Sequence, residues 1–318
     1  SAGRVQSVVV KLVKERENEI NSFTHTKYYK ITGSFDQDKL KANLSTTFPS
    51  SKEVKVFLNH CVNAEFTIGS ITSRKTTRKP SPPFITSTLQ QQASVKYGFS
   101  PKKTMMLAQR LYENGLITYM RTDSLALSED ALQSIQNEIE ARYGVEYHQR
   151  KEYTKKVKNS QEAHEAIRPS AMSKSDLTEM EEMGNDENKL YRLIWKRTIA
   201  CQMKPAKVNI MTIHITISNR EETFIAKGES ILFDGFLIVY KPVSIGEDTD
   251  ESDAENEFKM FASYKSGDTI EYTNLLGIEK ITKPPHGHYS EASLIKKLES
   301  IGVGRPSTYS SILSIVQD

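Results

Sequence analysis

The sequence predicts an α+β fold of several domains, in which a helical domain is inserted into a strand-rich arch. Residues that favour strands occupy roughly 27–77 and 206–282, whereas 84–203 carries mainly helical patterns. Prolines, which interrupt regular structure, lie at both junctions. They are Pro80, Pro82, Pro83 and Pro205. The two terminal segments are also helical, and we expect them to meet as a third unit.

These junctions give the expected domain boundaries. Both termini, 1–25 and 283–318, form a helical unit; 26–84 and 205–282 form the arch; and 85–204 form the inserted helical domain. A chain of 318 residues can bury enough core for two or three domains. An inserted domain that is joined through two strands can swing on them as a rigid body.

Composition indicates local basic surfaces and no membrane-spanning segment. The net charge is only +3, and basic residues gather in short runs at 74–79, 102–103 and 151–158. Such runs are ordinarily solvated faces, although together they could follow a phosphate backbone. Cys61 and Cys201 lack the spacing of a metal site. Because reduced thiols are typical of the cytosol and no signal peptide or long apolar run is present, we expect a cytoplasmic protein.

A helix is predicted directly before the most informative segment of the chain. Ser100 suits the N-cap, Pro101 suits the first helical position, and Gly115 suits the residue just past the end. Apolar residues four apart between them predict a buried face. The following residues, LITYM, favour extended backbone, and a second helix is predicted to begin near Ser128. Tyr119 therefore lies on a short connector between two helices.

The connector places three polar side chains at alternate positions. Residues 112–124 read YENGLITYMRTDS, and in an extended segment Tyr119, Arg121 and Asp123 share one face. A tyrosine with an ordinary pKa near 10 is only about 0.1% ionised at neutral pH, so a nucleophilic tyrosine needs a positive charge nearby. Arg121 can supply that charge and can grip a phosphate. The pattern suggests transesterification at phosphorus; the alternative is a packed aromatic beside a surface ion pair.

Two segments earlier in the chain carry further motifs. Residues 1–7, SAGRVQS, place Arg4 and Gln6 at a predicted helix N-terminus, where unpaired amides attract phosphate and Gly3 permits close approach. The alternative is an ordinary helix start with one exposed arginine. Residues 83–94, PFITSTLQQQAS, are a second motif that precedes the tyrosine connector.

A histidine and an arginine occur together in the middle of the chain. Residues 161–170 read QEAHEAIRPS, and His164 and Arg168 share a face if the segment is helical. A histidine can donate to a phosphate or relay a proton near neutral pH. The alternative is a surface pairing of these two residues with Glu162 and Glu165.

The last 36 or so residues combine two predicted helices with a glycine turn. The segment 283–318 contains SEASL and GRPSTY, and Arg305 is followed closely by the hydroxyls of Ser307 and Thr308. Glycines on either side of Val303 permit a tight turn. Taken alone, the segment is a helical hairpin or a helix-turn-helix.

Together these motifs, in this order, resemble type IA DNA topoisomerases over nearly the whole chain. Met120 favours the bacterial-type topoisomerase I branch, because topoisomerase III enzymes typically carry proline there. The resemblance implies that Tyr119 is the nucleophile, that Arg121 positions the scissile phosphate, and that His164 assists. It implies DNA contacts at Ser1, Ala2, Gly3, Arg4, Val5, Gln6, Arg121, Asp123, His164, Arg168, Arg305, Ser307 and Thr308.

The resemblance also implies a reaction. Such enzymes cut one DNA strand through a 5′-phosphotyrosyl intermediate, pass a strand through the break and reseal it, which relaxes negatively supercoiled DNA without ATP. The implied partners are single-stranded and negatively supercoiled DNA, and the protein is expected to be a nucleoid-associated monomer. The alternatives are a non-enzymatic single-stranded DNA-binding module and a tyrosine recombinase-like transesterase.

We expect this chain to be a fragment. In the family, a TOPRIM domain that holds Mg²⁺ precedes the SAGRVQS motif, and zinc ribbons often follow; neither is expected within this sequence, so the fragment alone should lack complete metal-dependent activity. The acidic run 247–257, EDTDESDAENE, is the only candidate metal site. Its dense like charges favour a solvated loop, so we expect no metal ligand there.

Overall fold

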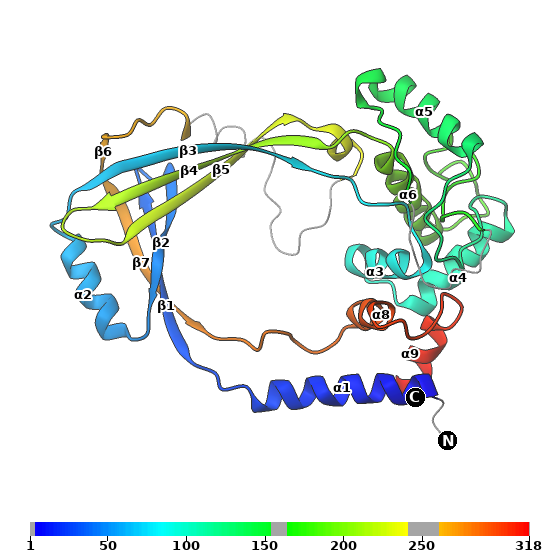
Figure 1. Ribbon diagram of the computed structural model, residues 1–318, viewed down its shortest axis with the longest axis horizontal. Coiled ribbons are helices and arrows are strands. Elements are labelled where there is room, and N and C mark those ends of the chain that lie inside the picture. Colours follow the sequence, from blue (N-terminus) through cyan, green and yellow to red (C-terminus); the bar gives the residue numbers. More distant parts are fainter. Residues whose placement is uncertain (1–3, 154–163, 241–260, 318) are drawn as a thin grey trace.

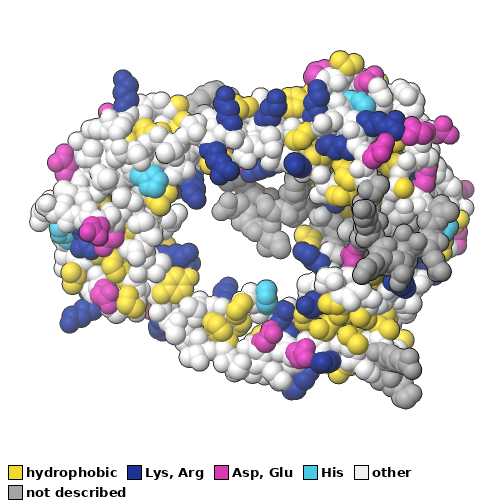
Figure 2. Space-filling model, viewed as in Figure 1, with side chains coloured by type: hydrophobic (Ala, Val, Ile, Leu, Met, Phe, Trp, Pro, Cys, Tyr) yellow, Lys and Arg dark blue, Asp and Glu magenta, His cyan; other side chains and the backbone are white. Residues whose placement is uncertain are grey.

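The computed structural model describes residues 4–153, 164–240 and 261–317. In Figure 1 the chain forms a ring, in which a curved sheet is the arch, helices form the opposite side, and the terminal helices close the base. Figure 2 shows that side chains leave the centre of the ring open and that Lys and Arg side chains lie along its rim. The predicted α+β fold with an inserted helical domain is confirmed.

One antiparallel sheet forms the arch in the described part of the chain. Its strands are β1 (Lys27–Phe35), β2 (Leu40–Phe48), β3 (Phe66–Arg78), β4 (Ala206–Ile217), β5 (Thr223–Phe233), β6 (Thr269–Ile270) and β7 (Tyr272–Ile281). They lie in the order β6-β3-β4-β5-β2-β1-β7. The pairing of β3 with β4 runs as far as Arg78 opposite Ala206. The chain therefore leaves the sheet and returns to it at adjacent positions, which is how the helical domain is inserted.

Aromatic rings fill the core of the arch. The ring of Phe35 lies 5.4 Å from that of Phe66 and 5.3 Å from that of Phe224. Helix α2 (Ser51–Cys61) covers this core with Val54 and Phe57. The prediction of strands throughout 27–77 is wrong at α2. The Ser50 side chain accepts a hydrogen bond from the Glu53 amide as an N-cap, and the buried residues recur at helical spacing.

The inserted domain is helical, as predicted. It contains α3 (Thr86–Tyr97), α4 (Pro101–Glu113), α5 (Glu129–Tyr143), the short 3-10 helix η1 (Val145–Tyr147) and α6 (Asn185–Cys201). The local signals around α4 are confirmed: Ser100 Oγ accepts from the Lys103 amide at 3.1 Å, and Gly115 has φ +67°. Ser128 is the N-cap of α5. These caps fix both ends of the connector that carries Tyr119.

A seam joins the helical domain to the arch. The 3-10 helix η2 (Gly235–Ile238) follows β5, yet Phe236 and Tyr240 are buried in the core of the helical domain. Arg197 of α6 donates to the Pro82 carbonyl at 2.6 Å and to the Tyr240 hydroxyl at 3.3 Å. One buried arginine therefore ties together the two linkers that connect the domains.

The terminal helices meet at the base of the ring. These are α1 (Arg4–Ser22), α8 (Glu291–Ser300) and α9 (Tyr309–Gln317). Val9 of α1 packs with Ile295 and Leu298 of α8 and with Ile312 of α9 in a small separate core. Within the described ranges, no helix combines the length and the apolar character needed to cross a membrane.

Gly235 at the seam gives a test of this packing. Its φ is +50°, and a Cβ atom there would lie 2.5 Å from the Lys204 carbonyl oxygen. Gly98 also has a positive φ, +66°, but open space around it. The left-handed backbone costs about 1–2 kcal/mol for either Ala variant, so only Gly235→Ala adds a backbone collision. We expect thermal unfolding of Gly235→Ala to begin several degrees below that of Gly98→Ala; equal midpoints would contradict the packing described.

Candidate active site

Tyr119 lies on an irregular segment between α4 and α5. Residues 116–128 form no regular strand, although Ile117 makes an isolated bridge with Pro169. The expected alternation is nevertheless present, because Met120 and Thr122 are buried and Arg121 is exposed. Tyr119 and Asp123 are partly buried, and they line two different cavities.

Hydroxyl groups hold the Tyr119 segment on both sides. The Thr118 amide donates to the Arg168 carbonyl at 2.9 Å, and the Thr118 hydroxyl donates to the Ala166 carbonyl at 2.7 Å. On the other side, the buried Thr86 hydroxyl donates to the Met120 carbonyl at 2.7 Å. Backbone that lacks a regular ladder must find such partners when it is buried. Tyr119 is thus anchored between α3 and the segment 164–170.

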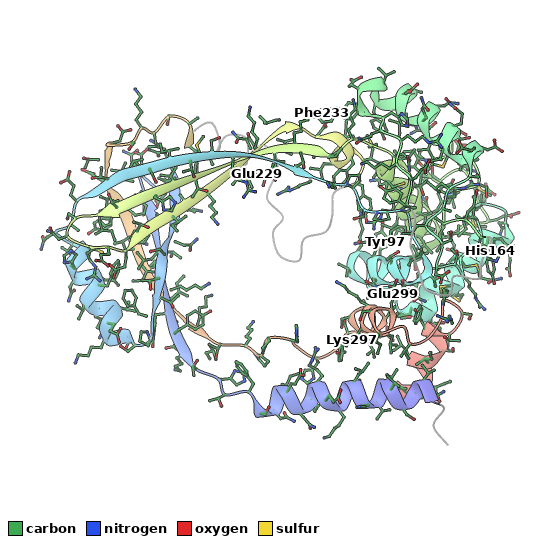
Figure 3. All side chains as sticks on the ribbon, viewed as in Figure 1. Tyr97, His164, Glu229, Phe233, Lys297 and Glu299 are labelled. Carbon is green, nitrogen blue, oxygen red and sulfur yellow. The ribbon has the colours of Figure 1, made fainter. Side chains whose placement is uncertain are left out.

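An open cavity of about 630 Å³ surrounds the Tyr119 side chain. The Tyr119 ring lies 5.4 Å from the His164 ring and 5.3 Å from the Tyr112 ring, which meets it edge-on. Thr118 and Glu165 complete the lining. Figure 3 shows His164 in the helical domain, on the side away from the sheet. The structure therefore brings Tyr119 and His164 together, as the motifs suggested.

Arg168 lies beside this cavity but is engaged by a carboxylate. Its Nε and Nη2 atoms lie 2.7 Å and 2.6 Å from Oε2 of Glu165, and its side chain is 16% exposed. The segment 164–170 is extended, because a residue before proline avoids the helical region, so the shared helical face expected for His164 and Arg168 is not formed. Arg121, by contrast, makes no ion pair with any residue of the described ranges.

The second cavity, of about 110 Å³, lies where the helical domain meets the base. Asp123 and Arg305 line it together with Glu299 of α8. The Ser87 hydroxyl of α3 donates to Glu299 at 2.7 Å across the boundary, and Figure 3 shows Glu299 on α8 next to α3. Burial raises the pKa of Tyr309, which also lines the cavity, to about 12; Glu299 adds to the shift and Arg305 opposes it.

Ser307 and Thr308 follow Arg305 at the start of α9. Ser307 is exposed, whereas the Thr308 hydroxyl accepts from the Arg305 amide at 2.9 Å. Thr308 therefore shapes the turn that presents the Arg305 side chain, which is exposed. Its hydroxyl is hydrogen-bonded to the backbone of Arg305, whereas the sequence motif predicted a contact to DNA.

Several expected site residues lie outside the described residues. They are Ser1, Ala2, Gly3 and the acidic run 247–257. Arg4 begins α1, and Val5 packs against the small core of the base while Gln6 is partly exposed. No group of three or more His, Cys, Asp or Glu side chains that could hold a metal ion occurs in the parts of the chain that the structure describes.

Several residues of the site were not predicted from the sequence. Tyr112, Thr118 and Thr86 line or hold the Tyr119 segment, and none was singled out there. The first two belong to the same string as Tyr119, but both lie an odd number of residues from it, so the two-residue alternation could not identify them. Glu165 appeared only as a partner in the alternative interpretation of the His164 motif.

A tyrosine hydroxyl beside an imidazole, with a free arginine two residues away, is suited to attack on a phosphodiester. A family model described as DNA topoisomerase matches residues 1–318, the whole chain. The chain belongs to the bacterial type IA DNA topoisomerase family. It is 42% identical to DNA topoisomerase 1 of Rickettsia felis, and 41% identical to DNA topoisomerase 1 of Campylobacter jejuni.

The matched region is only part of these topoisomerases. The alignments cover 100% of this chain but 43% of the Rickettsia felis protein, and 99% of this chain but 46% of the Campylobacter jejuni protein. The structure of full-length topoisomerase I from Thermotoga maritima matches with a TM-score of 0.82 and 34% identity. That match covers 99% of this chain and 51% of the Thermotoga chain. The topoisomerase fold thus extends over the described ring.

Thr118 gives a direct test of how the site is held. Thr118→Val keeps the shape of the side chain but removes the hydroxyl bonds to Ala166 and Arg168, which should lower the free energy of unfolding by about 1–2 kcal/mol. Amide hydrogen exchange should also speed up at Arg168. Thr77→Val, on the exposed end of β3, is the matched control. Unchanged exchange at Arg168 would show that the hydroxyl does not hold the two segments together.

Proposed function

We propose that the full-length protein containing this chain is a type IA DNA topoisomerase that cuts one DNA strand with Tyr119. The observation that supports this most strongly is the placement of Tyr119 against His164 in an open cavity, with Arg121 exposed two residues further on. The tyrosine can be reached by a strand, and a permanent positive charge is available close by. The family relationship supports the same chemistry.

In the proposed reaction, the Tyr119 oxygen attacks the phosphorus of a phosphodiester. A bond forms between that oxygen and the 5′ phosphate, the bond from phosphorus to the 3′ oxygen of the preceding nucleotide breaks, and the 3′ oxygen gains a proton as the phenol loses one. Arg121 stabilises charge on the phosphate oxygens, and His164 donates to the phosphate. Since the phosphodiester is exchanged and not hydrolysed, resealing requires no ATP.

We propose that single-stranded DNA approaches Tyr119 along the boundary between the helical domain and the base. Arg305 and Ser307 of the base are exposed, and Asp123 lies opposite Arg305 in the second cavity. The N-terminal motif, from Ser1 to Gln6, is proposed to extend this path. Because such a path takes one strand, underwound DNA is the preferred substrate, and its negative supercoils are relaxed. We propose a monomer associated with the nucleoid.

The open ring supports a gate. Covalent attachment at Tyr119 would hold one end of the cut strand on the helical domain while the base holds the other. Movement of the arch then separates the two ends, and a second strand can enter the opening whose rim carries Lys and Arg side chains (Figure 2). This step gives strand passage, and reversal of the reaction closes the cut.

Magnesium is proposed to be bound outside this chain. Type IA enzymes hold Mg²⁺ in a TOPRIM domain, where it supplies charge next to the cleaved phosphate. The described residues do not fit such a site, because they contain no cluster of three potential ligands. We therefore assign no step to a metal here.

The proposal is tested by the covalent link itself. In the full-length protein, Tyr119→Phe should abolish the covalent complex with single-stranded DNA, because the nucleophilic oxygen is removed, while affinity for DNA changes little. Tyr112→Phe is a matched control: its ring lies 5.3 Å from that of Tyr119 in the same cavity, and the link should persist. Covalent complexes are detected on denaturing gels with labelled oligonucleotides. A link that survives in Tyr119→Phe would sink the assignment.

The blocked DNA end separates the proposal from its alternatives. A topoisomerase of this type leaves the protein on the 5′ phosphate, so the product should carry a free 3′ hydroxyl that a polymerase can extend. A recombinase-like enzyme would leave the protein on the 3′ phosphate and a free 5′ hydroxyl. A DNA-binding module without activity would give no link at either end.

A further inference from the structure

A partly buried carboxylate at the Tyr119 cavity has no part in the chemistry described above. Glu165 lines the cavity with Tyr119 and His164. Its Oε1 accepts from the Ser128 amide at 2.9 Å, and its Oε2 accepts from Arg168 Nε at 2.7 Å. Both oxygens thus accept hydrogen bonds from within the protein.

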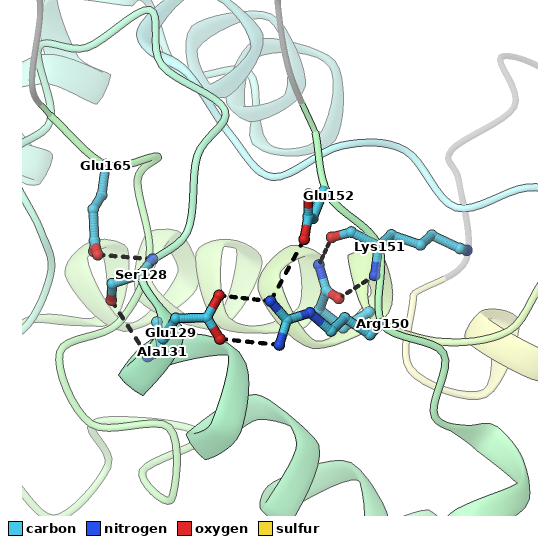
Figure 4. Close-up of polar contacts among 8 residues, drawn as sticks. Ser128, Glu129, Ala131, Arg150, Lys151, Glu152 and Glu165 are labelled. Carbon is cyan, nitrogen blue, oxygen red and sulfur yellow. Dashed lines mark hydrogen bonds and ion pairs between the residues drawn. The ribbon is translucent and has the colours of Figure 1, made fainter.

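Glu165 is bonded to the start of α5 and to Arg168 of its own segment. Ser128 is the N-cap of α5, and its side chain accepts from the Ala131 amide at 3.4 Å. Figure 4 shows Glu165 reaching the Ser128 amide at this helix end. Arg168, in turn, is bonded through its amide to the Thr118 hydroxyl at 3.0 Å, directly before Tyr119. One carboxylate therefore joins the start of α5 to the segment of His164, and Arg168 of that segment is bonded through its amide to the tyrosine segment.

The surroundings of Glu165 favour its charged form. Burial acts to raise the pKa of its carboxyl, but the hydrogen bonds from Ser128 and the charge of Arg168 outweigh burial and hold the pKa below its ordinary value. A carboxyl with a lowered pKa stabilises the fold above its ordinary pKa and loses that effect as the pH falls through the lowered one. The hydrogen bonds of Glu165 to Ser128 and Arg168 are therefore fully formed at neutral pH. A carboxylate with a lowered pKa is also a poor base for a phenol.

We propose that Glu165 is the positioning residue of the Tyr119 cavity and that Arg168 is its counter-ion, not a contact to DNA phosphate. This inference rests on the proposed function. The Arg168 guanidinium has two nitrogens on one carboxylate oxygen and a third, Nη1, 2.9 Å from the Pro169 carbonyl. Binding a phosphate would require it to give up these bonds. Arg121 and Arg305 remain exposed for that task.

Salt dependence of DNA binding distinguishes the two roles of Arg168. Each phosphate contact to a single strand contributes about 0.7 to the slope of log affinity against log salt. Binding of a fluorescent single-stranded oligonucleotide is measured in a full-length Tyr119→Phe background, where no cleavage competes. Arg168→Met should leave the slope unchanged, whereas Arg305→Met should reduce it. A reduction of about 0.7 for Arg168→Met would overturn the proposal.

Cleavage by the full-length protein with Tyr119 present supplies the second readout. Arg168→Met and Glu165→Gln should each slow formation of the covalent link by about 10- to 100-fold, as expected when reacting groups are misplaced by a fraction of an ångström to 1 Å. The double variant should be no slower than the slower single variant, because both changes break the same ion pair between Glu165 and Arg168. Unchanged rates or additive effects would overturn the proposal.

A neighbouring ion pair provides the matched control. Arg150 pairs with Glu129 through two bonds of 3.0 Å and 2.6 Å, also at the start of α5, but in solvent (Figure 4). Arg150→Met should leave the cleavage rate unchanged. If Arg168→Met folds poorly, Arg168→Lys keeps the charge but loses the paired geometry, and it should still slow cleavage without changing the salt slope. Failure of the proposed function would appear separately, as no covalent link in the unsubstituted protein.

Discussion

Burial of an irregular backbone segment is the constraint on which the candidate site depends. Residues 116–123 belong to no helix or strand, yet Met120 and Thr122 within them are buried, so their amides and carbonyls need partners outside a regular ladder. The Thr86 hydroxyl supplies several of them, and the Thr118 hydroxyl donates from the segment to the Ala166 carbonyl. The tyrosine is consequently fixed through its neighbours' backbone, which leaves its own hydroxyl available for chemistry.

Two arginines near Tyr119 have different electrostatic surroundings. Arg168 is largely buried and paired with Glu165, so the carboxylate within the protein already neutralises its charge. Arg121 is exposed and can meet a phosphate at full charge. The Coulomb interaction of an arginine with a phosphate weakens when a carboxylate already shares that arginine. In the proposed reaction, Arg121 would therefore be the main source of positive charge. The two sequence motifs present both residues as equivalent basic contacts and do not show this difference.

Local signals were predictable from sequence, and contacts between distant residues were not. Ser100 and Ser128 act within three residues of themselves, so the ends of α4 and the start of α5 followed directly from the sequence. The proximity of Tyr119 and His164 came from motif resemblance, because spacing alone left other interpretations open. The residues of helix α2 were predicted to be part of a strand-rich region. The Arg197 seam depends on Pro82 and Tyr240, which no local pattern connects to it.

The distribution of apolar cores indicates where a gate of the proposed kind would open. The helical domain shares its core with Phe236 and Tyr240 beyond β5, and Arg197 ties both linkers, so separation at this seam would expose apolar surface and break charged hydrogen bonds. The base has its own core, and it meets the helical domain across a cavity lined by Asp123, Glu299 and Arg305. The Ser87 hydroxyl donates to Glu299 across this boundary, and water can replace such a bond when the two parts separate. The boundary between α3 and α8 is therefore the easier one to part, and the linkers at the seam would move with the helical domain.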